Sequence, residues 1–172
     1  MLDAVDKYIN AMPDPRMKLA LGVLLRRVAD NLSSQVFSPG AGLAIKAAAS
    51  PLVKAGSAFR AVANGAPQVV AANTDMAALS GTVTNAKFNV FVFFIDRAGA
   101  LTTLMGREGA AVGAIQWPDF PEKKAAIGCV FINPTGTGDF VGGTTALDNA
   151  TVVPNAVYVN FIGAVDPSIV VG

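Results

Sequence analysis

The sequence predicts a mainly β protein, α+β overall, with an antiparallel sandwich-like or barrel-like body, an N-terminal helical segment and an extended arm. Val (21 residues) outnumbers Leu (12 residues). The strongest apolar run, residues 88–95 (FNVFVFFI), consists of aromatic and β-branched residues that are typical of strands. Short runs of this kind, separated by glycine-rich and proline-rich turns, favour a sandwich or barrel over an alternating β-α sheet.

Residues 1–34 form the predicted helical segment. Asp14 is a suitable helix cap and Pro15 suits the first helical position. Apolar residues then alternate in steps of four and three, as in one seam of a short coiled coil. We call this set the seam: Met17, Leu21, Leu24 and Val28.

Two arrangements of this helix remain open at the level of sequence. The seam can pack on the chain's own body, or it can pair with copies of itself or dock on a larger assembly. Gly22 and the short length of the helix weaken it as a stand-alone element.

Residues 35–66 are predicted to form an extended arm or linker. Ser38-Pro39-Gly40, Ser50-Pro51 and Asn64-Gly65 interrupt this stretch, and such residues prevent long regular elements. We expect two short strands here, at residues 43–48 and 58–63, and a hinge between the helix and the body.

Residues 67–172 form the predicted β body. The expected elements are a strand at 88–95, a turn at 96–99, a hairpin partner at 100–105, a buried strand at 125–133, and a last pair at 151–153 and 156–162. Strand alternation places Phe91 and Phe93 on one face of the first strand, and apolar residues also occupy the other face. That strand is therefore either central in a sandwich or covered by a neighbouring chain.

The composition argues against most kinds of catalytic site and several classes of binding partner. The chain has no histidine and one cysteine, which excludes His-based triads and most zinc sites. Its net charge of +1 gives no reason to expect nucleic acid, and no apolar run is long enough to predict a membrane span. Charged residues make up 15% of the chain against about 25% in an average globular protein, which favours a surface partly buried by neighbours.

The remaining polar groups suggest no enzyme and no cofactor. The loop acids Asp119, Glu122, Asp139 and Asp148 show no spacing that selects a catalytic pair, and we expect them to be structural or solvated. The stretch 133–138 (NPTGTG) resembles a phosphate loop only in its glycines, because it lacks the lysine and the following helix. Cys129 lies in an apolar run and is expected to be a buried, inert thiol.

Trp117 and Phe120 are the aromatic residues of a proline-rich loop. They are expected either to close the edge of the chain's own core or to lie in a subunit interface. The alternative role is a platform on which a sugar ring stacks.

The segment 125–165 resembles a stretch found in small structural proteins of tailed-bacteriophage virions. The words that carry the resemblance are GxVxINPTGTGxFVGGTTxLD and the VPNAVYxN that follows, here AIGCVFINPTGTGDFVGGTTALD and VPNAVYVN. The similarity extends back through FFIDRAGALTTLMGREGAAVGAIQWP, so it covers about residues 85–165 and leaves residues 1–65 outside.

The resemblance implies a head decoration (cement) protein without catalytic residues, located on the capsid surface of the virion after synthesis in the host cytoplasm. Its implied partners are copies of itself, as a homotrimer, and the major capsid protein. The alternative is a head-fibre or tail-associated domain that binds a receptor or carbohydrate. The residues expected at the interfaces are the seam residues Met17, Leu21, Leu24 and Val28 together with Phe91, Phe93, Trp117 and Phe120.

Overall fold

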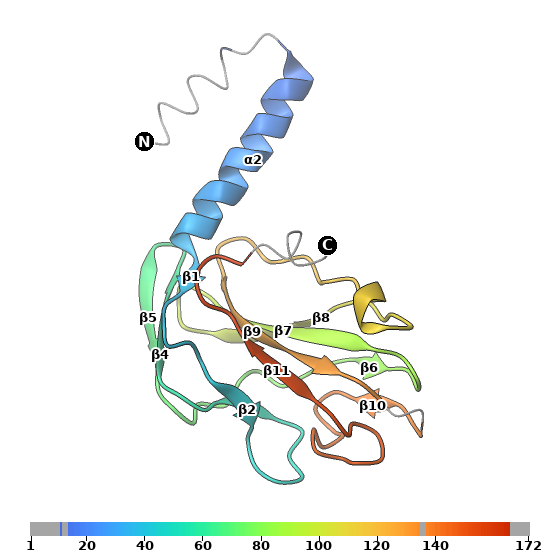
Figure 1. The fold of residues 1–172 in the computed structure, drawn as a ribbon. Coiled ribbons are helices and arrows are strands. Elements are labelled where there is room, and N and C mark those ends of the chain that lie inside the picture. The colour runs from blue at the N-terminus through green and yellow to red at the C-terminus, as the bar shows by residue number, and fades with distance from the viewer. Residues whose placement is uncertain (1–10, 12–13, 135–136, 166–172) are drawn as a thin grey trace.

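The computed structural model describes Ala11, residues 14–134 and residues 137–165. It contains one long helix and a β body built from antiparallel sheets (Figure 1). The mainly β, sandwich-like fold expected from the sequence is therefore confirmed. The first ten residues of the predicted N-terminal segment and residues 135–136 of the glycine-rich loop lie outside the described residues.

The helix α2 spans Pro15–Ser33 and begins where the sequence predicts. The Asp14 carboxylate accepts hydrogen bonds from the backbone N–H groups of Arg16 (2.8 Å) and Met17 (3.4 Å), and Pro15 occupies the first helical position. These contacts satisfy two backbone donors that the helix itself leaves unpaired.

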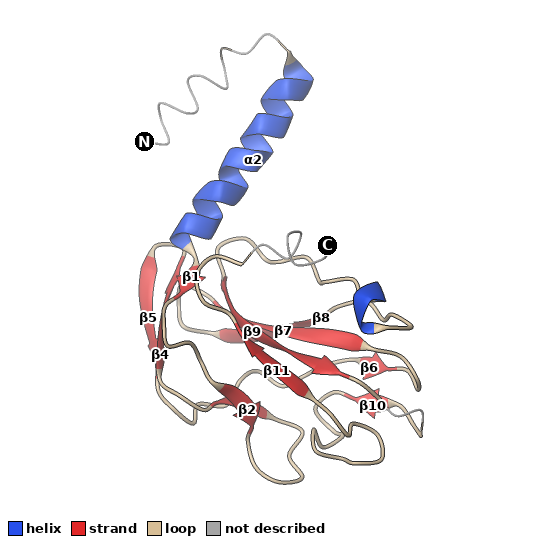
Figure 2. Cartoon of the chain, in the orientation of Figure 1, coloured by secondary structure: helices blue, strands red, loops and turns tan. Residues whose placement is uncertain are grey.

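The C-terminal end of α2 is fixed to the body by backbone hydrogen bonds. The Ser33 carbonyl accepts from the Gly65 N–H (2.9 Å), and the Ser34 hydroxyl accepts from the Asn64 N–H (3.0 Å). From this attachment the helix projects away from the β sheets (Figure 2).

A four-stranded antiparallel sheet forms one side of the body, in the order β11-β9-β7-β8. Its strands are β7 (Asn89–Ile95), β8 (Leu101–Met105), β9 (Ala125–Ile132) and β11 (Val157–Asn160). The β7–β8 turn matches the prediction, because the Asp96 carboxylate accepts from the Ala98 and Ala100 N–H groups (2.8 and 2.9 Å) and Gly99 adopts a positive φ.

Three small antiparallel sheets face the four-stranded sheet: β1-β4-β5, β2-β3 and β6-β10. Their strands are β1 (Gln35–Val36), β2 (Leu43–Ile45), β3 (Val53–Ala55), β4 (Phe59–Ala63), β5 (Ala66–Val70), β6 (Thr82–Val83) and β10 (Phe140–Val141). A short 3-10 helix, η1 (Val112–Ala114), lies in the loop between β8 and β9.

The segment predicted as an arm, residues 35–66, lies within the body rather than extending from it. It forms β1 to β4 and leads into β5, and its apolar side chains, such as Val36, Val53 and Phe59, belong to the main core. The short-strand expectations overlap the observed β2 and β4. The glycines and prolines break this segment into short strands, but those strands still pair and pack.

The last strand also differs from its prediction. Residues 151 and 152 lie in a turn, and β11 pairs instead with β9, with Val157 opposite Phe131 and Asn160 opposite Gly128. The pairing partner of a short strand depends on which open sheet edge lies nearby, and local sequence does not encode that.

Two apolar clusters lie on the two faces of the four-stranded sheet. The inner cluster fills the space between this sheet and the three small sheets, and it includes Phe59, Phe91, Phe93 and Phe140. The outer cluster includes Val90, Val92, Phe94 and Phe161 on the opposite face. β7 is thus central in its sheet and buried on both faces by its own chain. This is the first of the two arrangements considered for this strand, a central position in a sandwich.

Candidate functional site

The seam of α2 lies open on the outside of the chain. Met17, Leu24 and Val28 are 60%, 57% and 45% exposed, and Leu21 is partly buried. The body of the same chain does not cover these side chains, so the first of the two arrangements considered for the helix is not the one observed. An isolated helix of this length is marginally stable in water, because most helix stability in proteins comes from packing of the apolar face.

Phe91 and Phe93 require a correction. Their side chains are 0% and 1% exposed and point into the inner cluster, where the Phe91 ring lies edge-on to Phe140 with 5.9 Å between ring centroids. The small sheets of the same chain cover this face of β7, for which the sequence alone did not indicate a packing partner. We therefore remove both residues from the set offered to another chain.

Trp117 and Phe120 close the outer face of the four-stranded sheet. Trp117 packs edge-on against Phe131 (5.7 Å between centroids) and also contacts Phe120 and Phe161. Phe120 in turn packs edge-on against Phe94 at 5.0 Å. Both side chains are partly buried, so the loop that carries them serves as a lid on the outer cluster.

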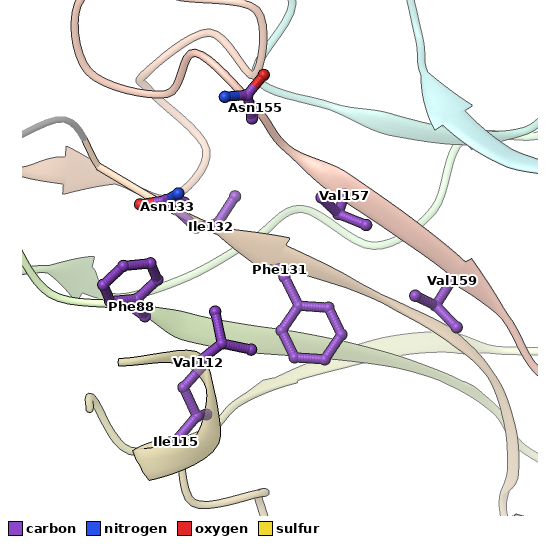
Figure 3. Close-up of a pocket in the computed structure, with 9 residues that line it drawn as sticks. All are labelled: Phe88, Val112, Ile115, Phe131, Ile132, Asn133, Asn155, Val157 and Val159. Atoms are coloured by element: carbon purple, nitrogen blue, oxygen red, sulfur yellow. The ribbon is translucent and has the colours of Figure 1, made fainter. Parts of the chain in front are cut away.

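A shallow apolar hollow of about 320 Å³ lies beside this aromatic lid. Figure 3 shows Val157 and Val159 projecting from β11 on one side, Val112 of η1 on the other, and Phe131 of β9 between them. Val112, Val157 and Val159 are 54%, 53% and 37% exposed. The hollow therefore presents apolar side chains to solvent.

Sequence reasoning missed this hollow, although one signal for it was present. The alternation Val157-Tyr158-Val159 places both valines on the outer face of β11 while Tyr158 packs on the inner cluster. Their proximity to Val112, 45 residues earlier in the chain, is a result of the tertiary fold. The local pattern alone predicts a half-buried strand.

Two of the four loop acids accept hydrogen bonds from the backbone of other loops, which is a structural role. The Asp139 carboxylate accepts from the Asn85 N–H (2.7 Å), and the Asp148 carboxylate accepts from the Ala49 N–H at 2.9 and 3.1 Å. Asp119 and Glu122 are exposed. Within residues 14–134 and 137–165, no group of three or more acidic or cysteine side chains is arranged to hold a metal ion.

Cys129 is fully buried in the outer cluster of β9. Burial raises the pKa of the Cys129 thiol from 9.0 to about 12, because the low-polarity surroundings disfavour the thiolate. Burial likewise raises the pKa of Tyr158 from 10.0 to about 12, with a further contribution from the negative charge of Asp148.

We expect the Cys129 thiol of the native protein to resist alkylation by iodoacetamide at pH 8.5 and to react fully in denaturant.

The free energy of unfolding should also decrease as the pH rises from about 9 towards 12. In that range the unfolded chain releases protons from Cys129 and Tyr158 that the native chain retains, so deprotonation favours unfolding. Alkylation of the native Cys129 thiol at the rate of the denatured chain would contradict its burial, and a free energy of unfolding that stays constant from pH 9 to 12 would contradict the raised pKa values.

Comparison with known proteins gives no further assignment: no family model, no curated protein and no solved structure matches the chain. Among the described residues, no helix combines the length and the apolar character needed to cross a membrane. Among the described residues, the seam of α2 and the hollow on the outer sheet face are candidate functional surfaces, because both present apolar side chains to solvent.

Proposed function

We propose that this chain is a non-enzymatic virion structural protein that decorates and stabilises the capsid of a tailed phage as a homotrimer. The observation that carries the proposal is the projecting helix α2 with its exposed seam. A β body from which a helix with exposed apolar side chains projects is suited to binding other chains.

The energetics of the seam support a role in assembly. Full burial of a Leu, Val or Met side chain contributes about 1.5–3 kcal/mol relative to leaving it exposed. Met17, Leu24 and Val28 retain roughly half of their surface in the isolated chain, so much of this stabilisation is still available to a partner. The proposed partners are further copies of the chain and the major capsid protein.

The resemblance of residues 85–165 to virion structural proteins supports the location on the capsid surface, after synthesis in the host cytoplasm. That part of the chain contains the four-stranded sheet and its aromatic lid. The described surfaces of this region offer apolar contacts and well-packed strands, which suit a cement protein that acts by binding.

The alternative, a head-fibre or tail-associated domain that binds a carbohydrate, depends on an open aromatic platform. Trp117 instead contacts Phe120, Phe131 and Phe161 of its own chain. These contacts favour the role of a core lid for Trp117, and we retain the decoration function as the proposal.

The experiment compares two double variants of the full chain in binding to undecorated capsids of the cognate phage. Leu24→Lys with Val28→Lys places charges on the seam, while Leu19→Lys with Val23→Lys makes the same change on exposed residues outside it. We expect co-sedimentation with capsids to fall at least tenfold for the seam variant and to remain near wild type for the control. Lysine is a good helix former, so both variants should keep α2.

Light scattering of the wild-type protein at micromolar concentration tests the oligomer. A trimer has a mass of three times 17.6 kDa. A monomer in solution would contradict the homotrimer, and full capsid occupancy by the seam variant would contradict the role of α2 in attachment.

A further inference from the structure

The turn between β4 and β5 carries the one Asn-Gly dipeptide of the sequence, Asn64-Gly65. We propose that Asn64 is a conditional deamidation site, which the attached helix α2 protects and which reacts when the end of α2 leaves the body. The modified turn no longer binds the helix, so the reaction acts as a one-way release of α2. This inference concerns the attachment of α2 and is independent of what the seam binds.

The local structure explains the Asn-Gly pair as a hairpin turn. β4 and β5 pair as far as Ala63 opposite Ala66, so Asn64 and Gly65 form a two-residue loop. Both residues have a positive φ, 48° for Asn64 and 74° for Gly65, as a tight hairpin turn of this length requires. Asparagine and glycine adopt this conformation more readily than other residues.

The end of α2 binds both backbone N–H groups of this turn. The Gly65 N–H donates to the Ser33 carbonyl (2.9 Å), and the Asn64 N–H donates to the Ser34 hydroxyl (3.0 Å). Strand pairing stops at the residues on either side, so α2 supplies the acceptors for the two N–H groups of the loop. The turn therefore has a second role, as the anchor of the helix.

Deamidation of an Asn-Gly pair begins with attack by the backbone nitrogen of the glycine. The Gly65 nitrogen bonds to Cγ of Asn64 and loses its proton, and the side-chain amide leaves as ammonia. Water then opens the cyclic imide to give aspartate or isoaspartate, and no oxidant or reductant is needed. Glycine favours the attack because it has no side chain to obstruct it. Asn64 is partly exposed and Gly65 is exposed, so water reaches the turn.

The attached helix opposes this reaction at the attacking nitrogen. The Ser33 carbonyl holds the Gly65 N–H, so ring closure requires this hydrogen bond to break first. The rate of deamidation therefore follows the fraction of molecules in which the end of α2 has separated from the turn. Such a local opening costs less free energy than unfolding of the whole chain.

The products of the reaction prevent α2 from attaching again in the same way. In isoaspartate the main chain passes through the side-chain carbon of residue 64, which adds a backbone atom before Gly65. A two-residue turn fixes the direction of its N–H groups, so the added atom displaces the Gly65 N–H from the Ser33 carbonyl. Both products also place a negative charge beside the C-terminal end of α2, where the helix dipole disfavours it.

The test follows residue 64 of the full chain at pH 8 by peptide mapping and mass spectrometry. Ser34→Ala removes the hydroxyl that accepts from the Asn64 N–H, and the control Ser80→Ala removes the hydroxyl of an exposed loop serine outside the turn. We expect the native wild type to deamidate more slowly than the chain in guanidinium chloride, by a factor of about ten or more. Ser34→Ala should react about tenfold faster than Ser80→Ala, because it lacks one anchoring hydrogen bond.

Amide hydrogen exchange measured by NMR follows the release of the helix. The isoaspartyl form carries one more negative charge than the unmodified protein, so ion exchange separates the two. We expect the Gly65 N–H to be protected in the unmodified protein and to exchange at the rate of an unfolded peptide in the isoaspartyl form. The N–H groups of β7 should stay protected in both forms, which shows that the body is still folded.

Three results would overturn the inference. Equal rates for the native and the denatured wild type would exclude protection of Asn64, and this comparison needs no variant. Equal rates for Ser34→Ala and Ser80→Ala, with both variants folded by circular dichroism, would exclude the link to α2. An isoaspartyl form that keeps the Gly65 N–H protected would exclude the release.

Discussion

Replacing Gly128 with valine is expected to lower the free energy of unfolding by about 3 kcal/mol, because the site has no room for a side chain. Gly128 lies in β9 between β7 and β11, opposite Phe93 and Asn160. A Cβ atom built on Gly128 would approach the Val159 carbonyl oxygen to 2.4 Å and the Leu43 Cδ1 atom to 2.6 Å. The carbonyl belongs to the backbone of the paired strand, so relief requires β11 to separate from β9.

Urea denaturation followed by circular dichroism measures this effect. Gly113→Val is the matched control, since a Cβ atom on Gly113 meets nothing within 4 Å and the residue is exposed in η1. We expect the control to change the free energy of unfolding by less than about 0.5 kcal/mol. Equal stabilities for Gly128→Val and Gly113→Val would contradict the close packing of β11 on β9.

Phe91→Ala is expected to destabilise the protein by about 3–5 kcal/mol, a large part of the total stability of a domain of this size. The side chain is fully buried between the four-stranded sheet and the small sheets, where it contacts the ring of Phe140. Its removal leaves a cavity that the surrounding strands fill only in part. The variant also loses the favourable free energy of moving a large apolar side chain from water into the core.

Phe37→Ala provides the comparison for this prediction, because Phe37 is the same residue type but is 42% exposed. We expect a loss below about 1.5 kcal/mol for Phe37→Ala in the same thermal or urea denaturation, because less apolar surface is buried at this position. The comparison also separates the two assignments that the sequence permitted for Phe91. An interface residue would leave the stability of an isolated monomer almost unchanged, whereas a core residue destabilises it.

The exposed seam of α2 distinguishes the effects of substitutions on stability from their effects on assembly. Substitutions in the inner cluster should destabilise each chain, whereas substitutions in the seam should alter association and leave the β body folded. The double variant Leu24→Lys with Val28→Lys follows this division, since both side chains are at least 45% exposed. A combined measurement of stability and mass for each variant therefore distinguishes core residues from contact residues.

Features that depend on residues close together in the chain could be predicted from the sequence. The cap at Asp14, the strand from Asn89 to Ile95 and the turn at Asp96 all appear where the sequence predicts them. Helix caps, strand alternation and turns involve contacts within about four residues along the chain, so their signals lie in the local pattern.

Which apolar faces are covered, and by which elements, depends on contacts between distant parts of the chain and could not be predicted from the sequence. The sequence showed that both faces of β7 are apolar. In the structure, the small sheets formed by residues 35–70, 82–83 and 140–141 bury Phe91 and Phe93, so these two residues are not available to a neighbour. β11 pairs with β9, and Val112 meets Val157 and Val159 around the hollow. These contacts join residues far apart in the sequence, and they arise because open strand edges and apolar faces pair with whatever the whole fold brings beside them.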